Sequence, residues 1–219
     1  MTIKHHPGDL LLLDYASGAL GEGWSLAVAT HLALCPTCRQ SKTDMEAIGG
    51  ALLEDQNPAT SSGLSFDHIE AQLNLQSDEV VRPTVKRATE RTPILPEPLR
   101  SYLGADLDTI DWRRLGIGAY HRLVPTEDAA TTARLIKIPA GNPVPMHSHQ
   151  GAELTLVVDG SFSDSTGNYG RGDFQEADET LQHQPEAGPD KDCICLVITD
   201  GPLRFKSVAA RIAQPFLGI

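Results

Sequence analysis

The sequence lacks the features of a membrane-spanning, exported or disordered chain. Its apolar runs, such as Leu10–Leu13, are far shorter than the ~20 residues that cross a bilayer. Residues 1–6 contain no basic region, apolar stretch or small-residue cleavage site of the kind that marks a signal peptide. Hydrophobic residues make up 40% of the 219 residues and charged residues 21%, as in ordinary soluble proteins. We therefore expect a cytoplasmic protein without a membrane partner.

Basic residues are scarce in the first part of the chain. Residues 1–80 carry 3 basic and 11 acidic side chains, residues 81–100 carry 5 and 2, and residues 101–219 carry 10 and 16. The formal net charge is −11. Because an acidic surface repels phosphate backbones, the charge argues against direct nucleic-acid binding. It favours a basic protein partner.

The apolar pattern of the first part is helical. The stretch Leu10–Leu20, with Asp9 as a plausible N-cap, predicts a first helix. Further apolar faces at helical spacing follow at Trp24, Val28, His31 and Leu32, at Met45, Ile48 and Leu52, and at Phe66, Ile69 and Leu73. A polar loop precedes the last face, with Ser65 as a possible N-cap. An amphipathic helix on such a tether is more often a partner-binding element than part of a small core.

The second part of the chain has the period of strands. A linker over residues 81–98 carries four prolines, Pro83, Pro93, Pro96 and Pro98. Beyond it, residues 134–138, 153–158 and 193–198 predict short strands, separated by Gly and Pro, which indicates an antiparallel barrel or jelly roll. We therefore predict an α plus all-β, two-domain protein, with a helical domain over residues 1–80 and a barrel over residues 99–219.

The strongest local signal in the helical part is His31-x3-Cys35-x2-Cys38. His31 falls on the last turn of the second predicted helix, and Pro36 suits the first position of the third. Three such donors at a helical corner suit Zn²⁺, which takes four ligands tetrahedrally. The fourth ligand should be a histidine, and both His5 and His6 are candidates. The alternative is that both cysteines are small buried side chains beside a polar histidine. A closed four-ligand site would be structural.

A second group of donors lies in the barrel part, in Gly141-x5-His147-x-His149-x3-Glu153-x6-Gly160. Residues i and i+2 of a strand face the same side, so both histidines point into the barrel and Glu153 keeps the same parity. His183 is the best candidate for a fourth ligand. Three imidazoles and a carboxylate suit Zn²⁺, Fe²⁺, Mn²⁺ or Ni²⁺. The alternative is that these are surface histidines on a loop.

Other candidates carry weaker signals. His68 and His121 have no ligand-like neighbours and are interpreted as ordinary residues. Cys193 and Cys195 share one side of a predicted strand, about 7 Å apart along the chain. They are either two small core residues of the barrel wall or oxidant-sensitive thiols near the metal.

His6 followed by His31-x3-Cys35-x2-Cys38 resembles the zinc-binding anti-sigma domain, and residues 141–160 resemble the first cupin motif. Together they resemble ChrR-type anti-sigma factors across nearly the entire chain. The resemblance implies that His6, rather than His5, binds zinc. The second cupin motif is only partly met, because the glycine turn Tyr169–Asp173 lacks the usual proline and His183 lies farther downstream than in the common form.

The resemblance also implies a function. In this family, three helices around zinc and a detached fourth helix clamp an extracytoplasmic-function sigma factor one to one. They block the association of the sigma factor with core RNA polymerase. The cupin domain then mediates its release in response to singlet oxygen or related oxidants. The chain is thus predicted to be a transcriptional regulator that is not an enzyme.

Two competing hypotheses remain open. One is a cupin metalloenzyme, dioxygenase-like, with a structural zinc appendage, in which Arg134, Lys137 and Tyr120 could position a substrate. The other is a metal sensor whose output depends on occupancy of the cupin site.

Overall fold

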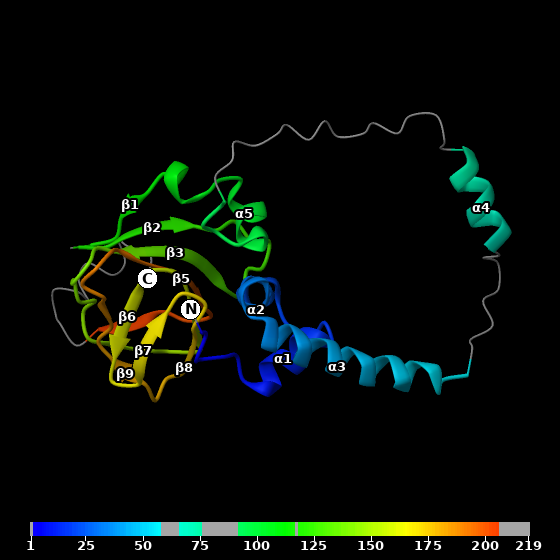
Figure 1. The fold of residues 1–219 in the computed structure, drawn as a ribbon, viewed down its shortest axis with the longest axis horizontal. Helices are drawn as coiled ribbons and strands as arrows, with labels where there is room; N and C mark the ends of the chain where they lie inside the picture. Colours follow the sequence, from blue (N-terminus) through cyan, green and yellow to red (C-terminus); the bar gives the residue numbers. More distant parts are fainter. Residues whose placement is uncertain (1, 58–65, 76–91, 117, 206–219) are drawn as a thin grey trace. The chain divides into compact units, whose positions relative to one another are not determined.

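The computed structural model describes residues 2–57, 66–75, 92–116 and 118–205 (Figure 1). Its contacts divide the chain into two compact units, one formed by Met1–Ile48 with Pro93–Ile219 and the other by Gly49–Thr92. The first unit therefore contains the first two helices together with the barrel. The predicted division into a helical domain over residues 1–80, a linker over residues 81–98 and a barrel over residues 99–219 stays a prediction. Among the described residues, none of the helices is both long enough and apolar enough to cross a membrane.

The described residues form the four predicted helices and a further short one. Their bounds are α1 Asp9–Ala16, α2 Glu22–Leu34, α3 Pro36–Glu54, α4 Phe66–Leu75 and α5 Glu97–Leu103, followed by a 3₁₀ turn, Leu107–Thr109. The prediction of Asp9 as N-cap is wrong, because Gly8 takes that position and Asp9 lies in the first turn. Gly8 is extended because its N–H donates to Glu176 Oε1 at 2.6 Å. The predicted cap Ser65 lies outside the described residues.

The barrel is built from antiparallel strands in three sheets. The largest has the order β1-β2-β3-β11-β5-β8, and the two smaller sheets have the orders β10-β6-β7 and β12-β4-β9. The bounds are β1 Arg113–Arg114, β2 Tyr120–Leu123, β3 Thr132–Ile138, β4 His147–His149, β5 Glu153–Asp159, β6 Ser161–Asp164, β7 Gly167–Gly170, β8 Phe174–Ala177, β9 Gln182–His183, β10 Glu186–Ala187, β11 Cys193–Thr199 and β12 Leu203–Phe205. The three predicted strands correspond to β3, β5 and β11.

The central strands β5 and β11 are buried on both faces, which explains their nearly continuous apolar sequences. Leu156 and Leu196 belong to a core that also contains residues of α2 and α5. Val157 and Val197, one position on, belong to the core inside the barrel. Glu153 therefore shares the parity of Val157 and faces the interior, as the strand period predicts.

Helices α2 and α5 pack beside one another against the outer face of the large sheet (Figure 1). Gly23 of α2 lies so close to Thr131 that a Cβ there would collide with the threonine side chain. Leu95 and Leu99 are completely buried in the same core. The C-terminal end of the predicted linker thus contributes to the core of the first unit.

A third, small core lies at the meeting point of α1, α2 and α3. It consists of Leu12, Val28, Leu32, Cys35 and Cys38, with Ile3 packed against it. Two of its five buried side chains are thiols, so hydrophobic burial alone gives this corner little stability.

Candidate metal centres

Four predicted ligands come together where α2 ends and α3 begins. The chain places His31 on the last turn of α2, Cys35 at its C-cap and Cys38 on the first turn of α3. One donor atom each from these residues and His6 lies within 4.8 Å of the others. We name this group, His6, His31, Cys35 and Cys38, the helical centre.

The distances in the helical centre suit zinc. His6 Nδ1 lies 3.4 Å from Cys35 Sγ and 3.3 Å from Cys38 Sγ. Tetrahedral Zn²⁺ with the usual Zn–S and Zn–N bond lengths needs donor separations of about 3.5 Å. The ring of His5 instead lies 4.4 Å from the ring of Tyr169. Of the two candidate histidines, the structure therefore brings His6 to the cysteines.

His31 is held as a neutral ligand. Its Nδ1 lies 2.9 Å from the carbonyl oxygen of Gly172, which can only accept, so Nδ1 carries the proton and Nε2 keeps its lone pair. Within the described part of the chain, Nε2 is buried without a hydrogen-bond partner. Burial lowers the pKa of His31 to about 4 despite the hydrogen bond to Gly172. A buried imidazole with an unused lone pair is suited to bind a metal.

The two cysteines of the helical centre are buried and close together, which favours a bound cation. Burial, together with the hydrogen bond and the charge of Cys35, raises the pKa of Cys38 to about 12. Two adjacent buried thiolates need a positive charge between them, and Zn²⁺ would supply it. The donor set and its geometry thus fit zinc.

The second predicted group lies inside the barrel. His147 and His149 come from β4, Glu153 from β5 and His183 from β9, and all four are buried. Their donor atoms also lie within 4.8 Å of one another. His183, which is far downstream in the sequence, reaches the group because it pairs directly with His147 across two antiparallel strands. We name this group the barrel centre.

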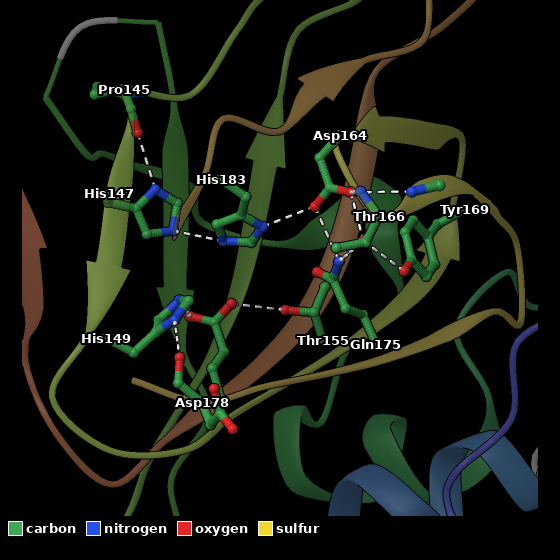
Figure 2. Close-up of polar contacts among 12 residues, drawn as sticks. Pro145, His147, His149, Thr155, Asp164, Thr166, Tyr169, Gln175, Asp178 and His183 are labelled. Atoms are coloured by element: carbon green, nitrogen blue, oxygen red, sulfur yellow. Dashed lines mark hydrogen bonds and ion pairs between the residues drawn. The ribbon is translucent and has the colours of Figure 1, made fainter. Parts of the chain in front are cut away.

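Each histidine of the barrel centre has its Nδ1 bonded to a protein acceptor (Figure 2). His147 Nδ1 donates to Pro145 O at 2.9 Å, His149 Nδ1 to Asp178 O at 3.3 Å, and His183 Nδ1 to Asp164 Oδ2 at 2.7 Å. The three Nε2 atoms therefore keep their lone pairs for the centre. His147 Nε2 and His183 Nε2 are only 3.1 Å apart, and His149 Nε2 is 3.6 Å from Glu153 Oε2. Burial lowers the pKa of His147 and of His183, which keeps both neutral.

The sequence analysis did not predict Asp164, whose carboxylate accepts the hydrogen bond from Nδ1 of His183, on the side of the ring away from the centre. Desolvation raises the pKa of its carboxyl group, but hydrogen bonds from Thr166, Gln175 and His183 outweigh it and lower the pKa to about 2. Asp164 is therefore a buried anion that fixes the tautomer of His183. It lies 19 residues from His183 in the sequence, and no motif spacing connects the two.

The remaining candidates lie outside the two centres. His121 Nδ1 is 3.1 Å from the guanidinium of Arg134, and the ammonium of Lys137 lies 5.1 Å from the ring centres of Trp112 and Tyr120. The side chain of His68 lies outside the described residues.

Cys193 and Cys195 are buried, free thiols in the barrel wall. Their sulfurs are 3.5 Å apart, closer than the spacing of about 7 Å expected along a regular strand. The reason is local: the pairing of β11 with β5 shifts register between Ile194 and Cys195.

Comparison with known proteins agrees with the description of both the helical part and the barrel part. The chain is 45% identical to the anti-sigma-E factor ChrR of Cereibacter sphaeroides over 219 residues, 100% of both chains. The chain belongs to the ChrR family of anti-sigma factors. A family model described as the ChrR cupin-like domain matches residues 101–203. The resemblance drawn from the two ligand patterns is thereby confirmed, as is the fold class of helices followed by a cupin.

A solved structure of a family member gives the same assignment. A chain in the crystal structure of Rhodobacter sphaeroides SigE in complex with the anti-sigma ChrR is 42% identical, with a TM-score of 0.77 over 91% of this chain and 100% of that chain. An RmlC-like cupin protein from Ralstonia eutropha is 20% identical, with a TM-score of 0.42 over 48% of this chain and 71% of its own. The second similarity is too distant to carry an argument.

Proposed function

We propose that this protein is an anti-sigma factor that binds one extracytoplasmic-function sigma factor, one to one, and blocks its association with core RNA polymerase. The observation that carries the proposal is the match to the ChrR structure in complex with SigE, which extends over 91% of this chain at 42% identity. The site of action is the cytoplasm. The acidic helical part suits a protein partner and not a direct contact with nucleic acid.

Each of the two compact units has exposed apolar side chains that such a partner could cover. They occur on three helices, as Leu10 and Leu13 of α1, Ile48, Leu52 and Leu53 of α3, and Phe66, Ile69 and Leu73 of α4. Scattered exposed apolar residues are common, but three in a row on one face of the short helix α4 are typical of a helix that packs on a partner.

We assign the two centres different roles. The helical centre holds a structural Zn²⁺ through His6, His31, Cys35 and Cys38, because two thiolates and two imidazoles are the donor set of closed, tetrahedral structural zinc sites. The barrel centre holds a divalent transition metal, Zn²⁺, Fe²⁺, Mn²⁺ or Ni²⁺, through His147, His149, Glu153 and His183. The cupin part would mediate release of the sigma factor in response to singlet oxygen or related oxidants.

Coexpression with candidate sigma factors tests the proposal. The full chain should copurify with one of them at a one-to-one ratio, measured by native mass spectrometry. Adding the chain should also reduce transcription by that sigma factor with core polymerase. A chain that captures no sigma factor, or captures one without reducing its transcription, would contradict the proposal.

One observation favours a second candidate, a metal-dependent enzyme. Within the described residues, a cavity of about 370 Å³ is lined by Glu153 of the barrel centre together with Arg134 and Thr199. A small oxygenated molecule could reach a metal there. Metal-dependent oxygen consumption with small organic acids or diketones would support this candidate. Binding of a sigma factor does not test it.

A further inference from the structure

One short segment, from Gly172 through β8 to Ala177, touches both metal centres. On the helical side, the carbonyl oxygen of Gly172 accepts the hydrogen bond from His31 Nδ1 at 2.9 Å. Asp173 Oδ1 accepts from the backbone N–H groups of Lys4 at 2.6 Å and His5 at 2.9 Å. The segment therefore orients one ligand, His31, and anchors the residues directly before another, His6.

The backbone on both sides of His6 also makes hydrogen bonds with β8 itself. Phe174 N–H donates to His5 O at 3.1 Å, and Gly8 N–H donates to the side chain of Glu176 at 2.6 Å. In the described sheet order β8 is the last strand, so this backbone lies at its outer edge.

On the barrel side, the next residues reach the other centre. The buried Gln175 donates through Nε2 to Asp164 Oδ2 at 2.9 Å, and the same oxygen accepts from His183 Nδ1 at 2.7 Å (Figure 2). Ala177, two positions on, pairs with Glu153. Asp173, directly before β8, and Gln175, the second residue of β8, are thus only two positions apart, which is one pleat repeat of a strand.

The segment is tightly fixed at its start. Gly172 has φ +93° and a Cβ there would lie 2.6 Å from the side chain of Ile3, so only glycine fits. Gly172 N–H donates to Val157 O at 2.8 Å, and Val157 N–H donates to Asp173 O at 3.1 Å. The turn is thus attached to β5, the strand that carries Glu153.

We propose that Gly172–Ala177 is a positioning segment shared by the two centres, in which Asp173 and the Gly172 carbonyl hold the ligands of the helical centre while Gln175, through Asp164, holds His183. A change of ligation at the barrel centre then alters the hydrogen bonds of Asp164 and Gln175 and loosens the edge of β8. The residues before His6 are anchored to that edge. The inference rests on metal binding at both centres, as proposed above, and does not depend on the sigma factor.

Coupling of this kind has a measurable consequence. Two coupled sites change one another's affinity by the same factor, commonly about fivefold or more. Because the proposed coupling loosens the backbone that holds bound ligands in place, we assign the change in affinity to dissociation of the metal. We expect zinc to leave the helical centre at least about fivefold faster when the barrel centre is empty than when it is loaded. The rate is measured with a chromogenic zinc chelator on the full-length protein. His149→Ala empties the barrel centre through a ligand with no bond to β8.

The link itself is tested with Gln175→Met, which keeps the volume of the side chain and removes its hydrogen-bond donor. Combined with His149→Ala, it should reduce the fivefold difference to less than twofold. Gln182→Met is the matched control, because this exposed residue neighbours His183 and lies outside the segment. It should leave the difference unchanged.

Hydrogen exchange provides a second measurement that does not depend on a ligand substitution. In wild-type protein, removing metal from the barrel centre by limited chelation should speed exchange at the amides of Lys4, His5 and Phe174. Equal zinc-release rates and equal exchange at these amides in the loaded and emptied states would overturn the proposal. Loss of sigma binding would leave it untouched, so the two proposals fail separately.

Discussion

Asp164 is a fully buried carboxylate whose hydrogen bonds all come from side chains and backbone of the barrel. Besides His183, it accepts from Thr166 N at 2.8 Å, Thr166 Oγ1 at 2.6 Å and Gln175 Nε2 at 2.9 Å. A carboxylate behind a ligating imidazole fixes the tautomer and makes the ligand more basic. The ring orientation of His183 therefore depends on a residue that does not bind the metal itself.

Asp164→Asn should weaken metal binding at the barrel centre by about 10–100-fold, the usual cost of losing a partner of a ligating histidine. The amide has one acceptor oxygen in place of two, so the donors around it cannot all be satisfied. Competition with a chelator of known affinity measures the change. Asp159→Asn removes a carboxylate that pairs with Lys191 at the surface and should leave the affinity unchanged. An Asp164→Asn protein with wild-type affinity would contradict this role.

Cys35→Ser should remove zinc from the helical centre and abolish sigma binding. The small core that contains Cys35 and Cys38 buries only three other side chains, and structural zinc binding is also folding free energy. Zinc content by elemental analysis and capture of the sigma factor measure the two effects. Cys193→Ser makes the same exchange in the barrel wall and should keep both. A Cys35→Ser protein that still binds the sigma factor would show that this corner does not need zinc to fold.

At the residue scale, spacing predicts a ligand only when it reflects local geometry. His147 and His149 are two apart on one strand and His31 and Cys35 are four apart at a helix end, so their convergence follows from the backbone. The partners Gly172 and Asp164 meet their histidines through strand pairing and helix docking. Such contacts have no fixed offset in the sequence, which is why they were not predicted.

At the scale of elements, α4 has an apolar face without a core of its own among the described residues. Phe66, Ile69 and Leu73 are 73%, 45% and 63% exposed. Replacing both Ile69 and Leu73 by Ala should weaken sigma binding by several kcal/mol, since a buried aliphatic side chain contributes about 1.5–3 kcal/mol. Calorimetric titration with the purified partner measures the loss. Asp67→Ala, off this face of the same helix, is the control, and an unchanged affinity for the double variant would mean that α4 does not dock.

The element that sequence reasoning described least well is α2. Its face with Val28, His31 and Leu32 was predicted, but Leu26 and Ala27 are also buried, against the barrel. A helix that is apolar on most sides is covered on most sides. The apolar periodicity predicts only one buried face of α2. It does not predict the second buried face, which packs with α5 against the large sheet.

At the scale of the molecule, the two centres occupy one compact unit but have different neighbours. The core of the helical corner buries only three side chains besides its two cysteines, whereas the barrel core buries six besides its own two, including Val157, Phe162 and Val197. Loss of metal should therefore unfold the first corner and leave the barrel folded. This difference in packing is the physical basis for the proposed separation of a sigma-binding part from a sensing part.

His147→Ala and Glu153→Ala should accordingly keep basal inhibition of the sigma factor and blunt the response to oxidant. The faster zinc release expected from an empty barrel centre is only about fivefold, which corresponds to about 1 kcal/mol. This is small beside the roughly 10–16 kcal/mol with which structural zinc is held. A sigma-dependent reporter, read with and without singlet oxygen, measures both properties, and metal content per variant confirms which centre is empty. Cys35→Ser provides the opposite control, with full reporter output in the absence of oxidant. If the barrel variants lose basal inhibition while their helical centre still holds zinc, the barrel takes part in binding the sigma factor and not only in sensing.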